Sequence, residues 1–235
     1  MLNRRQTLGQ LATLATLTGA AASARAQESC AVFTPTTQAA ITPDQALQRL
    51  KDGNQRFVAG RTVNCDLMKQ VKETSKGQSP FAVVVGCIDS RVPPELVFDQ
   101  RIGDIFAARV AGNFVNTDII GSVEFATAAA GAKLVVILGH SECGAIKGAI
   151  DDVKLGNLTA MLANIKPSID RLNYTGVRSS KDKDLVQRVA DQNARDAAAL
   201  LLSRSDVVRK LVTDGKVKVV SAMHDIGTGQ ISWFG

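Results

Sequence analysis

The chain has 235 residues, of which 45% are hydrophobic and 21% are charged, and its formal net charge is +6. This length can hold one α/β domain with a sizeable core or two small domains, and the composition gives no sign of disorder. Residues 1–26 contain three arginines and no acidic residue, so subtracting those three charges from +6 leaves +3 for the rest. No run of five or more basic residues occurs, which argues against a nucleic-acid partner.

The first 26 residues have the pattern of an export signal. They combine a basic start, an apolar stretch over 8–22 and an A-x-A cleavage motif at 24–26. The apolar stretch is too short to span a bilayer securely, so we expect no stable membrane anchor. The pair Arg4-Arg5 resembles a twin-arginine signal, although Thr7 stands where an aromatic residue is more usual, and an ordinary Sec signal is the alternative. We therefore expect a periplasmic or otherwise exported protein.

The segment after the signal is predicted to begin with a flexible lead-in over residues 27–41, which are small, polar and without periodicity. Thr42 then has the features of a helix N-cap, with Pro43 at the first helical position and Gln45 at the capping-box position. We expect this helix to run to about residue 51, to break at 52–54 and to resume briefly through 57–58. Residues 66–76 are predicted as another helix, and together these segments form a helical arm outside a sheet.

Two short apolar stretches dominate the rest of the chain: residues 81–91, FAVVVGCIDSR, and residues 133–143, KLVVILGHSEC. Each starts with five or more consecutive apolar residues, which is typical of a buried strand in a parallel sheet. Each apolar run ends at a glycine and is followed by polar residues. Because the carboxyl ends of parallel strands meet at one edge of a sheet, we expect Cys87, Asp89, His140 and Cys143 to lie close together. Those four side chains would form a tetrahedral zinc site.

The remaining elements complete one α/β domain over residues 42–235, a mostly parallel sheet flanked by helices. A helix over 118–131 is predicted to bury Val123, Phe125 and Ala126, and a helix over 143–153 to begin with Cys143 in its first turn. The other predictions are strands at 105–110, 217–223 and 231–234, and helices at 92–95, 157–172, 182–202 and 205–213. No internal repeat or long linker divides the chain.

Asp89 decides whether the metal site is open or closed. Two thiolates and one imidazole leave one tetrahedral position, and an open fourth position is the catalytic pattern. Arg91 lies two residues after Asp89, where its planar fork can bind the carboxylate and hold it off the metal. A zinc hydroxide would then attack a small electrophile, at a rate that rises toward alkaline pH. The alternative is a structural zinc ion closed by Asp89.

The same residues resemble the zinc signature of the β-class carbonic anhydrases, over roughly residues 42–234. The likeness rests on C-x-D-x-R at 87–91, H-x-x-C at 140–143, R-V-A-G-N at 109–113, Glu124 and G-A-I-K-G at 144–148. It implies one Zn²⁺ per chain, reversible hydration of carbon dioxide to bicarbonate and a proton, and a homodimer or higher homo-oligomer in which the arm covers a neighbouring subunit. The alternatives are hydrolysis of carbonyl sulfide or carbon disulfide on the same fold, and a non-catalytic oligomer stabilised by zinc.

The resemblance also implies roles for residues outside the ligand set. Gln78 matches a glutamine that lines the substrate pocket, and Phe106 matches an apolar residue of its wall. Phe125 stands where some members have a tyrosine, so one hydroxyl contact is missing. Val84 stands where members with a separate inhibitory bicarbonate pocket have a tryptophan, which argues against strong regulation of that kind.

Two further features stay open at this level. Cys30 and Cys65 remain after the metal motif has taken the other two cysteines, and they form either a disulfide or two free thiols. His224 has no companion ligand in the sequence, so we expect it at the surface or hydrogen-bonded in the region of the final hairpin.

Overall fold

A computed structural model describes residues 30–234, so the predicted export signal, the first part of the predicted lead-in and Gly235 lie outside the described residues. Its centre is a five-stranded sheet with the order β2-β1-β3-β4-β5. The strands are β1 Ala82–Gly86, β2 Ile105–Arg109, β3 Leu134–His140, β4 Lys218–His224 and β5 Ile231–Phe234. The first four are parallel and β5 is antiparallel to β4, which confirms the predicted mostly parallel sheet.

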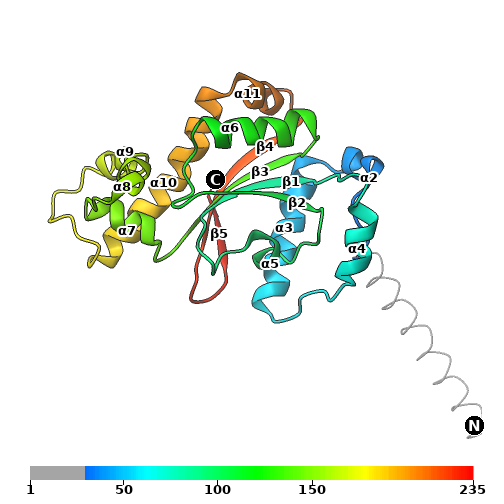
Figure 1. Ribbon diagram of the computed structural model, residues 1–235, viewed down its shortest axis with the longest axis horizontal. Coiled ribbons are helices and arrows are strands. Elements are labelled where there is room, and N and C mark those ends of the chain that lie inside the picture. The colour runs from blue at the N-terminus through cyan, green and yellow to red at the C-terminus, as the bar shows by residue number, and fades with distance from the viewer. Residues whose placement is uncertain (1–29, 235) are drawn as a thin grey trace, which may run out of the picture.

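Helices cover both faces of the sheet (Figure 1). One face carries α3 (Pro43–Val58) and α5 (Pro94–Val97). The other carries α6 (Thr117–Glu124), its π-helical continuation η1 (Phe125–Ala129), α10 (Lys183–Arg204) and α11 (Asp206–Thr213). Beyond the carboxyl ends of the strands lie α7 (Gly144–Ile150), α8 (Gly156–Leu162) and α9 (Lys166–Arg171). None of the helices within the described residues is long and apolar enough to cross a bilayer.

Alternate residues of the central strands build two separate cores. Val85 and Ile137 face α6 and α10, whereas Val84 and Val136 face α3 and α5. All residues of β1 and β3 are buried, because a parallel sheet with helices on both faces exposes neither side of its inner strands. This double burial is why both strands appear in the sequence as uninterrupted apolar runs.

The N-terminal arm differs from its prediction in three respects. Residues Pro35–Ala40 form helix α2 with a Thr34 capping box, so this part of the predicted flexible lead-in is structured. Helix α3 starts at the predicted Thr42 cap but continues without a break through Gly53. Gly53 is needed there for close packing, since a Cβ atom would come within 1.8 Å of the carbonyl oxygen of Phe98. Helix α3 also packs on the sheet itself, while α2 and α4 (Leu67–Thr74) form the outer part of the arm.

Two helix predictions beyond β2 were also wrong. Phe125 is 58% exposed, because Val123 and Ala126, three residues apart, share the buried face of the helix and Phe125 points to the other side. The helix predicted over 157–172 is divided into α8 and α9. Pro167 lies in the first turn of α9, where a proline is tolerated, but it would break a continuous helix.

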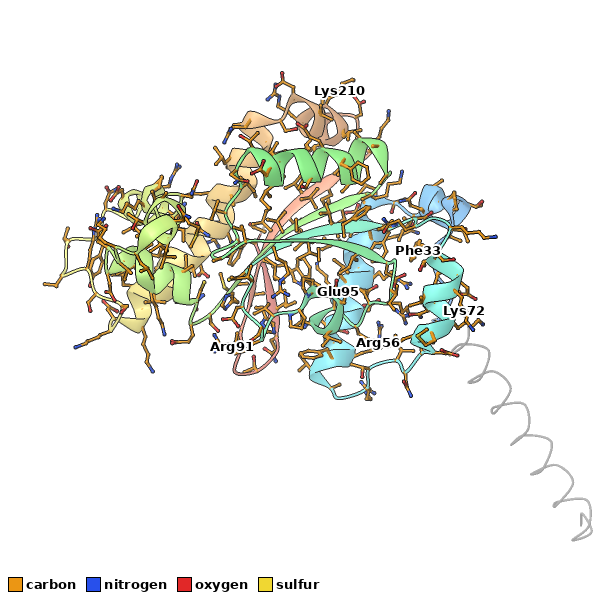
Figure 2. All side chains as sticks on the ribbon, in the orientation of Figure 1. Phe33, Arg56, Lys72, Arg91, Glu95 and Lys210 are labelled. Atoms are coloured by element: carbon orange, nitrogen blue, oxygen red, sulfur yellow. A yellow bond between two sulfur atoms is a disulfide. The ribbon has the colours of Figure 1, made fainter. Side chains whose placement is uncertain are left out.

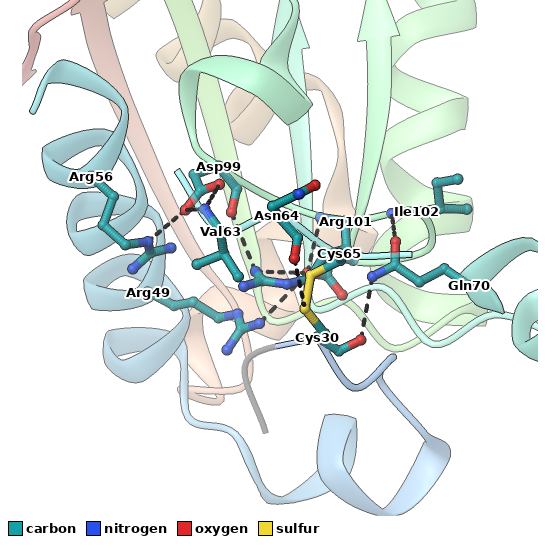
Figure 3. The surroundings of a disulfide bond; sticks show 11 residues. Cys30, Arg49, Arg56, Val63, Asn64, Cys65, Gln70, Asp99, Arg101 and Ile102 are labelled. Carbon is teal, nitrogen blue, oxygen red and sulfur yellow. Dashed lines mark hydrogen bonds and ion pairs between the residues drawn. A yellow bond between two sulfur atoms is a disulfide. The ribbon is translucent and has the colours of Figure 1, made fainter. Parts of the chain in front are cut away.

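Cys30 and Cys65 form a disulfide, which settles the alternative that the sequence left open. Figure 3 shows it beside a layer of paired charges. Gln70, buried on α4, donates to the Cys30 carbonyl at 3.3 Å, and Arg56 of α3 pairs with Asp99 at 2.5 Å. The disulfide thus ties the segment before α2 to the loop that precedes α4.

We expect the substitution Cys65→Ser to lower the free energy of unfolding by about 2–4 kcal/mol, because the bond closes a loop with a sequence separation of 35 residues. Denaturant unfolding of the wild type with and without reductant measures the effect, and the reduced wild type should match the variant. An unchanged midpoint on reduction would show that the bond contributes nothing to stability.

Candidate metal centre

Three side chains with metal-binding atoms meet at the carboxyl end of the sheet. Cys87 follows β1, His140 is the last residue of β3, and Cys143 is the N-cap residue of α7. Their ligand atoms all lie within 4.8 Å of one another, and all three residues are buried. The predicted meeting of the two strand ends is therefore confirmed.

The parallel register explains why these residues meet. Gly86, the last residue of β1, pairs with Leu138 of β3, so Cys87 follows β1 beside the last two residues of β3. Gly139 packs closely beside β4, because a Cβ atom there would lie 2.7 Å from the Met223 methyl group and would force that side chain to move. Cys143 begins α7, where free backbone N–H groups favour a thiolate.

The charges and hydrogen bonds of the three ligands fit a cation such as zinc. The Cys87 and Cys143 sulfur atoms lie 4.0 Å apart. Their shared hydrogen bond lowers the pKa of Cys87 to about 4 and raises the pKa of Cys143, so the pair retains one proton until a cation compensates the second charge. His140 Nδ1 lies 2.9 Å from the Ser141 carbonyl, to which it donates, while its buried Nε2 has no partner among the described residues. The lone pair of His140 Nε2 is therefore available to bind a metal.

Asp89 lies beside the three ligands and is held by Arg91. Arg91 Nε and Nη2 donate to the two carboxylate oxygens at 2.9 and 2.7 Å, and the Arg91 backbone N–H adds a third bond at 3.0 Å. These bonds hold the pKa of Asp89 well below its usual range. The nearer carboxylate oxygen is 3.9 Å from His140 Nε2. Figure 2 shows Arg91 at the loop end of the sheet, on the side away from Lys210 of α11.

The loop that carries Cys87 and Asp89 is held by two residues, Arg109 and Gly112, for which the sequence predicts no individual role. Arg109 at the end of β2 donates to the Cys87 carbonyl at 2.8 Å and to the Asp89 carbonyl at 2.7 Å. Gly112 donates its backbone N–H to Cys87 Sγ at 3.3 Å. Both residues lie within the R-V-A-G-N run, so the resemblance marked the segment without showing what it does.

The other predicted site residues do not join this cluster within one chain. Gln78 is exposed in the loop before β1, and Phe106 pairs in register with Val83 near the start of that strand, whereas the ligands follow its other end. His224, expected at the surface or hydrogen-bonded, is buried in register with His140, and neither ring nitrogen has a partner within residues 30–234. The prediction failed because β4 ends at His224, one residue beyond the predicted end at 223, and so places His224 inside the sheet beside His140. Burial lowers the pKa of His224.

We expect Arg91→Leu to raise the pKa of Asp89 toward the ordinary value of about 3.9, because the substitution removes the bidentate partner. In the wild type the depressed pKa means that the pair's contribution to stability is complete above about pH 4 and is lost only as the pH falls through the folded-state pKa. Carboxyl NMR titration of the metal-free protein measures the change, because a bound zinc ion could itself bind Asp89 once Arg91 is removed. Asp152, paired with Lys154 and Lys166, is the internal control and should not move. An unchanged Asp89 titration would contradict the role of Arg91.

Comparison with known proteins agrees with this geometry. The sequence profile described as carbonic anhydrase matches residues 82–231. Carbonic anhydrase 2 of Mycobacterium tuberculosis is 30% identical over 190 residues, covering 80% of this chain and 91% of that protein. The carbonic anhydrase of Mycolicibacterium smegmatis is 31% identical, covering 80% and 92%. A tetrameric β-carbonic anhydrase of Sordaria macrospora superposes with a TM-score of 0.62 at 27% identity, covering 72% of this chain and 90% of that one. The chain is thus a member of the β-class carbonic anhydrase family.

Proposed function

We propose that this protein catalyses the reversible hydration of carbon dioxide to bicarbonate and a proton, with one zinc ion per chain held by Cys87, His140 and Cys143. The observation that carries the proposal is the incomplete ligand set: two sulfur atoms and the free Nε2 of His140 converge, and a fixed carboxylate stands beside them. The bound ion would supply Lewis acidity that makes water a nucleophile near neutral pH.

Asp89 and Arg91 would prepare the reacting water. Both carboxylate oxygens already accept from Arg91, which supports a position for Asp89 beside the metal rather than on it. As an ionised group Asp89 can only accept, so it would take a hydrogen bond from the water and direct an oxygen lone pair toward carbon dioxide. A structural zinc site closed by Asp89 would first have to break this bidentate pair.

A role for Gln78 and Phe106 at the substrate pocket requires a second copy of the chain. Within one subunit they lie toward the amino ends of the strands, whereas the metal ligands lie at the carboxyl ends. Exposed apolar residues on α4, Leu67 and Met68, also support burial against another subunit. We propose a homo-oligomer, and the Sordaria macrospora relative is described as tetrameric.

An exported location is part of the proposal. The Cys30–Cys65 disulfide supports it, because such bonds persist in oxidising compartments and are rare in the cytosol. Export in the folded state by the twin-arginine route would allow Cys87 and Cys143 to bind zinc before they meet oxidants, which fits their buried positions.

Stopped-flow hydration by the zinc-loaded protein tests the activity. We expect Asp89→Asn to lower the hydration rate by about 100-fold or more. The amide has a single accepting oxygen, which cannot accept hydrogen bonds from Arg91 and from the water as the two carboxylate oxygens can. Asp206→Asn, an exposed change at the start of α11, should leave the rate unchanged. A wild-type protein no faster than buffer would reject the proposal, and rapid sulfide release from carbonyl sulfide without hydration of carbon dioxide would favour the alternative substrate.

The pH profile is a separate test. Cys87 and Cys143 as thiolates would cancel the charge of a divalent ion, which makes the site less able to acidify water than one built from three histidines. We expect the hydration rate to rise between about pH 6 and pH 9. Asp89 stays ionised across this range, so its own titration would not produce the rise. A flat profile over the same range would contradict the two-thiolate site.

A further inference from the structure

Asn193 is a polar residue on the buried face of helix α10. It lies four residues after Val189 and four before Ala197, within a stripe that otherwise consists of core residues. Asn193 is only 2% exposed. An amide is costly to bury without partners, so this position calls for a specific hydrogen-bonding role.

The partner of Asn193 is the loop that contacts the metal ligand. Asn193 Nδ2 donates to the Gly112 carbonyl at 2.8 Å, and Gly112 in turn donates its N–H to Cys87 Sγ at 3.3 Å. Helix α10 is thereby connected to a predicted zinc ligand through a single residue. Asn193 itself does not touch the ligand set.

Gly112 needs an external constraint. Its φ is +82°, and a Cβ atom there would lie 2.7 Å from the Ile165 side chain, so the position excludes other residues. A glycine has no side chain to restrict its backbone rotation. The hydrogen bond from Asn193 anchors Gly112 through its carbonyl, and so keeps the residue, whose N–H lies in the preceding peptide plane, within reach of the Cys87 sulfur.

We propose that Asn193 is a positioning residue that holds the Gly112 N–H against the Cys87 sulfur. The inference rests on the metal role of Cys87 proposed above. A hydrogen bond to a thiolate withdraws charge from the sulfur, which limits how far two thiolates neutralise the bound cation. Asn193 would thus tune the metal through the backbone without contacting it.

The test uses the full chain loaded with cobalt or with an NMR-active cadmium isotope. In the wild type, a scalar coupling between cadmium and the Gly112 amide proton would report the N–H···S bond directly. We expect this coupling to disappear in Asn193→Leu and Asn193→Asp. The thiolate-to-cobalt charge-transfer band should move to lower energy, and zinc affinity measured by competition should fall about 10-fold.

Asn54 provides the matched control. It is also a buried helical asparagine, 7% exposed, on the other face of the sheet. Its Nδ2 donates to two carbonyls, that of Val97 at the end of α5 at 3.0 Å and that of Gly229 in a loop at 2.9 Å. Asn54→Asp and Asn54→Leu should destabilise the fold comparably but leave the coupling, the band and the affinity unchanged.

The outcomes separate this inference from the proposed function. A wild type that binds neither cobalt nor cadmium at the cysteines would overturn both. Metal binding with a coupling that persists in the Asn193 variants, or with equal spectral changes in the Asn54 variants, would overturn the inference alone. Because Asn193→Asp preserves the size of the side chain, it decides the question even if Asn193→Leu does not fold.

Discussion

The hydrogen-bonded register between β1 and β3 is the constraint on which the rest of the structure depends. It places Gly86, the last residue of β1, beside Leu138, two residues before the end of β3, so that Cys87 and His140 lie close together although 52 intervening positions separate them in the chain. Because side chains alternate along a strand, a slip by one residue would turn every side chain of the shifted strand to the other face and would move its ligand along the edge of the sheet. The buried valines and leucines on both faces prevent such a slip, since it would also exchange the two cores.

The site combines a rigid frame with a few polar contacts that hold its loops. Arg91 fixes Asp89 from the side chain, Arg109 fixes the same loop through its carbonyls, and Gly112 contacts the sulfur of Cys87. Each contact uses a strong donor, and most join the loop to a neighbouring strand or loop. Such an arrangement suits chemistry that depends on placing a small reactant accurately, because little must be reorganised when the reactant arrives.

The sequence predicted the parts of this structure that local chemistry determines. The apolar runs of β1 and β3, the Thr42 cap and the meeting of Cys87, His140 and Cys143 all follow from short-range patterns. The misplaced features depend on distant neighbours. Gly53 was predicted as a helix break because its contact with the Phe98 carbonyl lies far along the chain. His224 was expected at the surface or hydrogen-bonded because nothing local showed that β4 would pair beside His140. The position of Asn193 could have indicated a buried hydrogen bond, since a lone amide on the apolar face of a helix is unusual. Its partner, the Gly112 carbonyl, could not be identified without the fold.

The covalent bond between Cys30 and Cys65 spans the whole of α2 and α3. A protease that cut the exposed loop around Gly60 would open the backbone, yet the released end would stay attached to the body through sulfur. Helix α3 would then remain on its face of the sheet after hydrolysis, and the two fragments would stay together as one molecule with its core intact until a reductant cleaved the disulfide.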